Sequence, residues 1–221
     1  MYQSRRTPVN ALRRVGRMSW EHEAEVAELV RGGLIIYPTE TFYALGCLAT
    51  IHPAVERIFS VKGRPLDKPL PLIVSDWEMS ERFLRLTGIE EELARKFWPG
   101  PLSIVTDVDP QVSPLARDRT GRSAVRMSPH VIAARLSREA GAPLVSSSAN
   151  RSGLPPVCRP DELDSELVLE SGALVIASNP WPGGGLPSTL VDIVGANSVR
   201  ILRAGAISAE EITAAGFEVL S

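Results

Sequence analysis

The chain alternates between short apolar runs and longer segments in which apolar side chains recur every three or four residues. Short runs bounded by glycine or proline predict buried strands, whereas the longer spacing predicts amphipathic helices. Strands are expected at residues 34–37, 70–74, 102–106, 123–127, 144–146, 173–177, 189–194 and 199–202. Helices are expected from Ser19 to the glycines at 32–33, over residues 53–61, and after the capping residues Ser75, Thr87, Ser128 and Ser208.

Helix starts and ends are marked by polar caps, prolines and glycines. Ser75, Thr87 and Ser208 are each followed three residues later by glutamate, a spacing at which the two residues cap each other's backbone amides. Ser128 precedes a proline that suits the first helical position, and Gly141 predicts the end of that helix. The mixed order of helices and strands predicts a single α/β domain, with a twisted mixed parallel and antiparallel sheet flanked by helices.

The size of the chain agrees with this fold. Its 221 residues are 44% hydrophobic, which is enough for one domain with a large buried core. We place the folded domain at residues 19–212, after a basic extension at residues 1–18 and before a C-terminal tail at residues 213–221. The first 17 residues contain five arginines and no acidic residue. This composition suits a disordered leader, a transit peptide or a nucleic-acid-binding arm.

Global properties restrict the functional class. A net charge of -2 and a pI near 6.0 oppose a general nucleic-acid binder, although a local basic patch stays open. No apolar stretch approaches the roughly 20 residues that span a bilayer, so no membrane partner is expected. Cys47 and Cys158 have neither disulfide nor metal-ligand spacing, which predicts free thiols in a reducing compartment and a cytoplasmic location.

Two polar clusters carry the strongest chemical signal. The first is Lys62-Gly63-Arg64-Pro65, at the end of a predicted helix, with a third cation at Lys68. The second is Ser147-Ser148-Ala149-Asn150, which follows an apolar run. Fixed cations neutralise a polyphosphate, while short hydroxyl and amide groups bond its remaining oxygens. The two clusters therefore predict a nucleotide-handling enzyme with a concave basic cleft.

Other segments leave more than one interpretation. Pro38-Thr39-Glu40-Thr41 is either a polar turn or a wall of hydroxyls with one carboxylate at the mouth of the cleft. The flexible segment at residues 183–189, Gly-Gly-Gly-Leu-Pro-Ser-Thr, is either a connector or a lid. The glycine patterns of P-loop and dinucleotide-binding proteins are absent from the sequence, and no catalytic triad can be assembled from it. Chemistry without a protein nucleophile predicts that one substrate attacks another directly.

Several of these segments occur together in one known family. The chain resembles the threonylcarbamoyl-AMP synthases, the YrdC-like proteins of tRNA modification. The matching stretches, in family order, are residues 37–41, 43–46, 62–65 with Lys68, 98–101, 124–126, 147–150 with 152–153, 188–189 and 201–203. The resemblance implies a YrdC-like fold and a nucleotidyltransferase, an L-threonylcarbamoyladenylate synthase. Such an enzyme converts ATP, L-threonine and bicarbonate into pyrophosphate and threonylcarbamoyl-AMP, which supplies N6-threonylcarbamoyladenosine in tRNA.

The resemblance also implies roles for individual residues. Lys62 and Arg64 would be the catalytic cations, and ATP would be bound by Lys62, Arg64, Lys68, Ser148, Asn150 and Arg203. L-threonine would be bound by Thr41, Arg126, Ser146 and Ser188, with the arginine paired to its carboxylate. Mg²⁺ would accompany ATP and spread the charge of the leaving pyrophosphate, and no protein residue is assigned to the metal. A downstream threonylcarbamoyl transferase complex and tRNA are the implied partners.

Departures from the family pattern keep other functions open. Phe42-Tyr43-Ala44 replaces the usual Val-Tyr-Gly, which predicts a tighter turn, and Ile73 stands where longer relatives place a histidine. The main alternative is an RNA-binding module of the same fold without synthase activity, holding tRNA or double-stranded RNA. A carbamoyl-adenylate enzyme like the related domain of hydrogenase-maturation carbamoyltransferases would need zinc-binding cysteine motifs, which this sequence lacks. An inactive paralogue is disfavoured because both polar clusters are intact.

Overall fold

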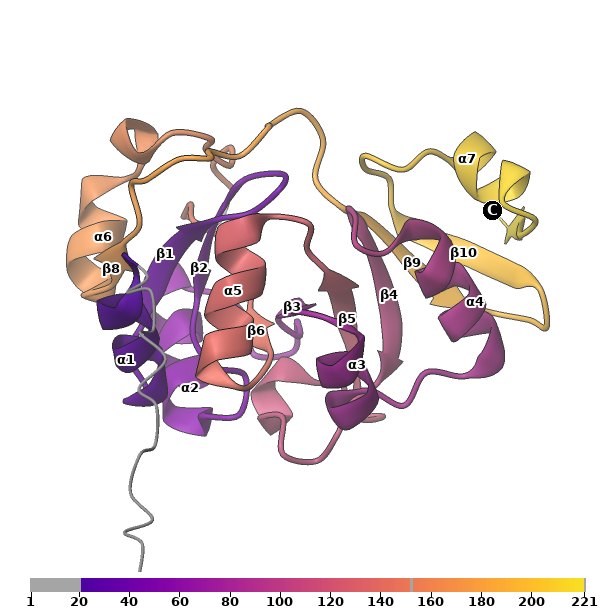
Figure 1. Cartoon of the computed structure of the whole chain (residues 1–221), viewed down its shortest axis with the longest axis horizontal. Coiled ribbons are helices and arrows are strands. Elements are labelled where there is room, and N and C mark those ends of the chain that lie inside the picture. The colour runs from indigo at the N-terminus through magenta and orange to yellow at the C-terminus, as the bar shows by residue number, and fades with distance from the viewer. Residues whose placement is uncertain (1–20, 152, 221) are drawn as a thin grey trace, which may run out of the picture.

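Two β-sheets form the centre of the molecule, and helices cover them (Figure 1). The computed structural model describes residues 21–151 and 153–220. The smaller sheet has the strand order β7-β2-β1-β8 and consists of β1 (Ile35–Pro38), β2 (Tyr43–Gly46), β7 (Ser147–Ser148) and β8 (Leu174–Val175). The larger sheet has the order β11-β10-β9-β4-β5-β3-β6. Its strands are β3 (Leu72–Val74), β4 (Leu102–Asp107), β5 (Arg122–Met127), β6 (Leu144–Val145), β9 (Thr189–Ile193), β10 (Ser198–Arg203) and β11 (Glu218–Leu220).

Both sheets combine parallel and antiparallel pairs, which confirms the predicted mixed architecture. β1 pairs antiparallel with β2 and parallel with β8. β5 pairs antiparallel with β4 and parallel with β3. The sequence predicted one sheet, whereas the structure has two, because the chain crosses between them at Ser146. Just before this residue β6 pairs with β3, and just after it β7 pairs with β2.

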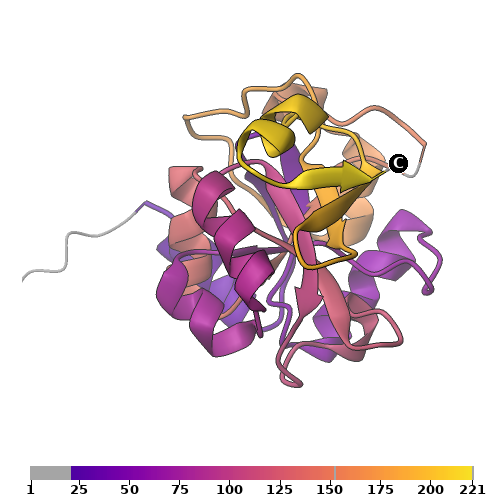
Figure 2. The same cartoon turned by 90° about the vertical axis from the view of Figure 1, so that its right-hand side faces the viewer.

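Helices pack on both sheets. They are α1 (Glu23–Val30), α2 (His52–Lys62), α3 (Trp77–Phe83), α4 (Gly88–Phe97), α5 (Val131–Ala140), α6 (Ser165–Ser171) and α7 (Ala209–Ala214), with short 3-10 turns at Pro114–Ala116 and Pro160–Glu162. α5 contacts both β1 and β3, so it covers the junction of the sheets. In Figure 2, α7 and β11 (yellow) lie together in front, where β11 forms one edge of the larger sheet. No helix within the described ranges is long and apolar enough to cross a bilayer.

Two buried tyrosines fix the smaller sheet to its surroundings. The Tyr37 hydroxyl donates to the carbonyl of Val145 in β6 at 2.9 Å, which ties β1 to a strand of the larger sheet. The Tyr43 hydroxyl donates to the carbonyl of Ile176 at 3.0 Å. Both rings are fully buried, so these bonds satisfy the polar ends of aromatic side chains in the core. The loop between β1 and β2 is therefore anchored at both ends.

Helix capping follows the prediction at two sites and differs at a third. At Thr87 and Ser208 the glutamate three residues later accepts the amide of the capping residue, as predicted. α3 is capped instead by Asp76, whose carboxylate accepts the Met79 amide at 2.9 Å. An ionised carboxylate is a stronger acceptor than a hydroxyl, so Asp76 takes the position that was predicted for Ser75.

α5 begins later than predicted. The expected cap, Ser128, donates its hydroxyl to Glu40 and accepts the His130 amide, and the helix starts only at Val131. Gly141 ends the helix as predicted, with a left-handed φ of 76° that glycine adopts without strain. The hydroxyl of Ser128 is thus used by a contact between the two sheets rather than by a helix terminus.

Four elements were not predicted, namely β2, β7, α6 and β11. β2 and β7 contain alanine, glycine and serine, so they lack the apolar run by which strands are recognised. β11 falls within residues 213–221, which were predicted to be a tail, and instead pairs in parallel with β10 and extends the larger sheet. The predicted basic extension, residues 1–18, and the predicted cap Ser19 lie outside the described residues.

A close backbone approach at Gly46 predicts a large effect on folding. A Cβ at this position would lie 2.1 Å from the Val145 carbonyl oxygen and 2.8 Å from the Tyr37 ring. Gly46→Ala should therefore lower the free energy of unfolding by about 2 kcal/mol or more, as overpacking does. Gly88→Ala is the control, because a Cβ there would meet no atom within 4 Å. Urea denaturation measures both variants, and equal stability of the two would contradict this packing.

Candidate functional site

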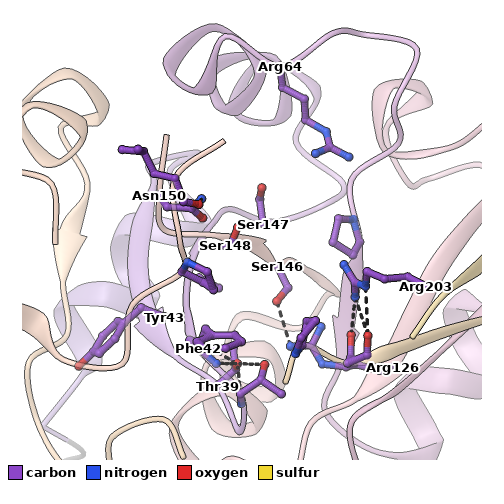
Figure 3. A pocket seen from close by; sticks show the side chains of 17 residues that line it. Thr39, Phe42, Tyr43, Arg64, Arg126, Ser146, Ser147, Ser148, Asn150 and Arg203 are labelled. Carbon is purple, nitrogen blue, oxygen red and sulfur yellow. Dashed lines mark hydrogen bonds between the residues drawn. The ribbon is translucent and has the colours of Figure 1, made fainter. Parts of the chain in front are cut away.

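A cavity of about 340 Å³ lies where the two sheets meet, beside the crossing point at Ser146 (Figure 3). Its wall comes from the β1–β2 loop and the start of β2, the β6–β7 segment and the loop after it, the loop after α2, the segment just before β9, and residues of β5 and β10. The lining residues are Thr39, Thr41, Phe42, Tyr43, Ala44, Arg64, Pro71, Arg126, Ser146, Ser147, Ser148, Asn150, Leu154, Pro156, Pro187, Ser188 and Arg203.

The lining of this cavity is cationic. Arg64, Arg126 and Arg203 reach it from three separate segments of the chain (Figure 3). None of the described residues that line it is acidic. Serine and threonine hydroxyls and one asparagine amide supply most of the other polar groups. This combination suits anionic ligands that are bonded at several oxygen atoms.

Arg126 is held in a fixed orientation at the wall of the cavity. The residue is only 4% exposed. Its Nε donates to Glu40 Oε1 at 2.7 Å, and Nη2 donates to Ser146 Oγ at 3.3 Å. Burial alone would raise the pKa of Glu40, but Arg126 and the Ser128 hydroxyl outweigh burial and hold this pKa below its ordinary value. Glu40 therefore meets the guanidinium as an ionised carboxylate at neutral pH.

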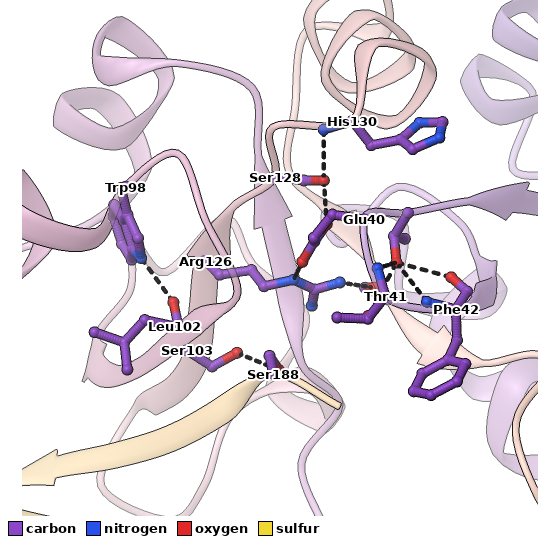
Figure 4. A network of polar contacts seen from close by, with 12 residues as sticks. Glu40, Thr41, Phe42, Trp98, Leu102, Ser103, Arg126, Ser128, His130 and Ser188 are labelled. Carbon is purple, nitrogen blue, oxygen red and sulfur yellow. Dashed lines mark hydrogen bonds and ion pairs between the residues drawn. The ribbon is translucent and has the colours of Figure 1, made fainter. Parts of the chain in front are cut away.

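Arg203 and Ser188 form a second polar pair at the wall. Arg203 donates through Nη2 to the Ser188 carbonyl at 2.8 Å and to the Ser188 hydroxyl at 2.9 Å. The same hydroxyl lies 3.0 Å from Ser103 Oγ (Figure 4). These contacts join the end of β10 to the segment just before β9, so the sequence-predicted pair Ser188 and Arg203 shares one site.

Lys62 lies behind the Ser147–Asn150 segment and is not part of the lining. It is 7% exposed, and its Nζ donates to the carbonyl oxygens of Ser148 and Asn150, with a distance of 2.6 Å to the latter. Burial and, to a smaller extent, the charge of Arg64 lower the pKa of Lys62 to about 8. The lysine thus holds the backbone of two residues whose side chains line the cavity.

Arg64 and Lys68 are close in the chain but differ in position. Arg64 lines the cavity and donates to the carbonyls of Lys68 and Pro69 at 3.0 and 2.9 Å. The Lys68 side chain is exposed and does not belong to the lining. The other predicted site residues do line it, and they are Thr41, Arg126, Ser146, Ser148, Asn150, Ser188 and Arg203.

The polar turn after β1 forms part of the wall. Thr39 donates its hydroxyl to the Phe42 carbonyl at 2.7 Å and lies 3.3 Å from the Thr41 hydroxyl. All three residues line the cavity, which favours the functional interpretation of this segment over that of a simple turn. Glu40 differs from the prediction, because its carboxylate pairs with Arg126 behind the wall instead of standing at the mouth (Figure 4).

Sequence reasoning missed part of the lining. Thr39 and Ser147 lie inside motifs that were singled out, so their neighbours provided a signal for them. Leu154 and Pro156 come from a loop without a recognisable pattern, whereas Pro187 lies in the segment 183–189 that was interpreted as a connector or a lid. The segment 183–185 lies against the β1–β2 loop, because the amides of residues 183 and 184 donate to carbonyls of that loop at 3.3 and 2.9 Å.

Neither Cys47 nor Cys158 lines the cavity. Cys47 and Cys158 are free thiols, as predicted. Within residues 21–151 and 153–220, no group of three or more histidine, cysteine or carboxylate side chains could hold a metal ion. Ser152, which belongs to the predicted family pattern, lies outside the described residues.

The part of the chain that forms the cavity is similar to known proteins. The family model for Sua5, YciO and YrdC proteins, described as "Telomere recombination", matches residues 27–205, a range that contains every lining residue. The threonylcarbamoyl-AMP synthase of Stenotrophomonas maltophilia is 36% identical over 149 residues, which are 66% of this chain and 80% of that protein.

Solved structures show the same fold. The crystal structure of P. abyssi Sua5 complexed with L-threonine aligns with a TM-score of 0.77 and 30% identity, over 88% of this chain and 57% of that one. The chain therefore spans little more than half the length of that relative. E. coli YciO aligns with a TM-score of 0.74 and 23% identity, over 85% of this chain and 90% of that one, which shows a shared fold. The family model and the curated relative together show that the chain belongs to the Sua5/YciO/YrdC family, which includes threonylcarbamoyl-AMP synthases.

Proposed function

We propose that this chain is an L-threonylcarbamoyladenylate synthase. It forms threonylcarbamoyl-AMP and pyrophosphate from ATP, L-threonine and bicarbonate, and so supplies the N6-threonylcarbamoyladenosine modification of tRNA. One observation carries the proposal: a single cavity unites three arginines with hydroxyl and amide groups at the positions that the family resemblance assigns to the two substrates. Similarity to a relative named threonylcarbamoyl-AMP synthase and to a Sua5 structure with L-threonine supports it.

The L-threonine site would centre on Arg126. The planar guanidinium matches a planar carboxylate and pairs with it through two parallel hydrogen bonds. Thr41, Ser146 and Ser188 line the same cavity and would bond the amine and the side-chain hydroxyl of the substrate. Ser146 already touches Arg126, so the carboxylate and its neighbouring groups would be recognised together.

The ATP site would lie on the side of the cavity formed by Arg64, Ser148 and Asn150. Arg64 reaches the cavity from the loop after α2, while the serine and asparagine follow the sheet crossing. Lys62 stands behind this serine and asparagine and adds positive charge to the phosphate side. Arg203 would close the nucleotide site from β10.

The reaction joins two anions, which explains the cationic lining. The threonine amine would bond to the carbon of bicarbonate with loss of water. An oxygen of the resulting carbamate would then attack the α-phosphorus of ATP, and pyrophosphate would leave. Both steps need substrates held close together and positive charge near the reacting oxygens, and neither needs a protein nucleophile.

The same reaction implies an enzyme class, a metal ion and partners. Transfer of an adenylyl group makes the enzyme a nucleotidyltransferase. Since no described lining residue is a carboxylate, Mg²⁺ would be held by phosphate oxygens and water and arrive with ATP. When bound, it spreads the charge of the pyrophosphate. We place the enzyme in the cytoplasm, with a threonylcarbamoyl transferase complex receiving the product and tRNA as a further contact.

Pyrophosphate release from the purified chain tests the function. ATP, bicarbonate and L-threonine are supplied together and then omitted one at a time. The synthase requires all three for release. Release that ignores threonine or bicarbonate would indicate a different ATP-consuming reaction. Absence of release combined with salt-sensitive RNA binding would support the RNA-binding alternative.

A further inference from the structure

A buried carboxylate joins the two sheets directly behind the cavity. Glu40 lies in the loop between β1 and β2 of the smaller sheet, and its side chain is 11% exposed. Oε1 accepts the hydrogen bond from Arg126 Nε at 2.7 Å, and Oε2 accepts the hydroxyl of Ser128. Arg126 and Ser128 come from β5 and the residue just after it, in the larger sheet. Both oxygens of Glu40 are thus engaged across the junction of the sheets (Figure 4).

Glu40 itself does not line the cavity, although Thr39 and Thr41 on either side of it do. Its carboxylate therefore does not contact the substrate directly. Its effect on a ligand has to pass through Arg126. Since Arg126 and Ser128 are two positions apart along extended backbone, one carboxylate contacts both on the same side of the chain.

The contact with Glu40 determines which edge of the Arg126 guanidinium faces the cavity. Arg126 has five N–H donors in one plane, and Glu40 occupies the Nε–H. The Nη edge is then the part of the group that remains to face the cavity, where Ser146 already receives one bond from Nη2. An arginine without this anchor would rotate about its side-chain bonds and present its fork in several directions.

We propose that Glu40 is a positioning residue for substrate recognition: it fixes the orientation of Arg126 so that the guanidinium meets the carboxylate of the amino-acid substrate. This inference rests on the proposed function, in which that substrate is L-threonine. It also links the β1–β2 loop to recognition of the amino-acid substrate, because this loop carries both Thr41, which lines the cavity, and Glu40, which orients Arg126.

Glu40→Gln tests the proposal, because glutamine preserves the shape of the side chain but removes its charge and one acceptor oxygen. Steady-state pyrophosphate release is measured while L-threonine and ATP are varied separately. The KM for L-threonine should rise by about tenfold or more, the worth of one charge-assisted hydrogen bond, while the KM for ATP changes by less than about twofold. Ser128→Ala removes only the second anchor and should raise the threonine KM in the same direction by a smaller factor.

Glu90→Gln is the matched control. Glu90 is another buried glutamate with two hydrogen bonds, to the Thr87 amide and the Thr106 hydroxyl, and it lies on α4 away from the lining. This variant should leave both KM values unchanged. Calorimetric titration with L-threonine alone supplies a readout independent of turnover, and Glu40→Gln should weaken binding there by the same factor.

The possible results separate this inference from the proposed function. If the wild-type chain releases pyrophosphate in a threonine-dependent manner but Glu40→Gln and Ser128→Ala keep the wild-type threonine KM, the positioning role is wrong and the synthase stands. Equal shifts of both KM values would also overturn it, since they indicate a general disturbance. If Glu40→Gln does not fold, Ser128→Ala alone decides by the same criterion. A wild-type chain without threonine dependence would remove both proposals.

Discussion

Lys62→Gln is expected to lower kcat/KM for ATP by roughly 10²-fold, because it removes a positive charge from directly behind the part of the cavity assigned to the phosphates of ATP. Lys62 carries its charge next to Ser148 and Asn150, which are assigned to the nucleotide. Glutamine keeps N–H donors for the two carbonyl oxygens that the lysine bonds but brings no charge. Pyrophosphate release at varied ATP concentration measures the loss.

Two comparisons separate charge from structure in this experiment. Lys62→Met removes the donors as well and should lower the free energy of unfolding by about 1–3 kcal/mol for each carbonyl left without a partner. Lys96→Gln removes a lysine from the exposed end of α4 and should leave turnover unchanged. Wild-type kcat/KM in a folded Lys62→Gln variant would show that this cation does not serve the phosphates.

The pH dependence of ATP binding follows from the same residue. Because the pKa of Lys62 is about 8, its charge is present at neutral pH and is lost as the pH rises through this value. The affinity of the free enzyme for ATP should therefore fall between about pH 7 and pH 9, and stay level over that range in Lys62→Gln. Titration calorimetry with ATP alone measures it, so that the threonine amine does not contribute.

The titration of Lys62 does not destabilise the folded chain at alkaline pH, so unfolding caused by this residue cannot explain the loss of ATP affinity. The unfolded lysine keeps its ordinary pKa near 10.5, so between the two pKa values the unfolded chain binds more protons than the folded chain. The contribution of Lys62 to the free energy of unfolding then rises with pH, while ATP affinity falls. An alkaline fall in affinity that persists unchanged in Lys62→Gln would assign the effect to another group.

Arg126→Met is expected to raise the KM for L-threonine by roughly 10²-fold or more, because the substrate carboxylate loses its cationic partner inside a largely buried site. The KM for ATP should change by only a few-fold. The variant also leaves the Glu40 carboxylate buried without its cation, so thermal unfolding is measured in parallel. Arg126→Lys keeps a charge without the planar fork and should fall between the wild type and Arg126→Met.

Arg122 provides the control on the same strand. It lies four residues earlier in β5, so it shares the strand face of Arg126. It pairs with Asp192 and does not line the cavity. Arg122→Met should leave both KM values near those of the wild type. An equal rise of the threonine and ATP requirements in Arg126→Met would show that this arginine does not recognise the amino-acid substrate.

The fold was predictable wherever local pattern and tertiary structure agree. The runs at β1, β3 and β4 are apolar enough to identify buried strands, and Gly141 ends α5 in the left-handed conformation that glycine favours. β2 was missed because pairing with β1 and β7, and not an apolar run of its own, makes it a strand, and β7 was missed because it pairs with β2, which lies far away in the sequence. The division into two sheets depends on the same pairing at Ser146.

The motifs in the sequence predicted most of the residues that line the candidate site, but they did not predict which residues contact each other there. Ordered motifs identified most of the lining, because the family resemblance aligns them with known roles. The burial of Lys62 was not expected, since a lysine at a helix end is usually solvated, and here two backbone carbonyls replace water. The partner of Arg126 was equally hidden, because Glu40 is 86 positions away in the sequence.

Mass spectrometry of the nucleotide product tests the central claim most directly, namely that one cavity makes ATP, L-threonine and bicarbonate react with each other. The purified chain is incubated with Mg²⁺, ATP, ¹³C-bicarbonate and ¹⁵N-L-threonine, and the products are separated at once. We predict a threonylcarbamoyl-AMP that carries both labels, formed together with pyrophosphate. A product consisting only of unlabelled AMP or ADP would contradict the account.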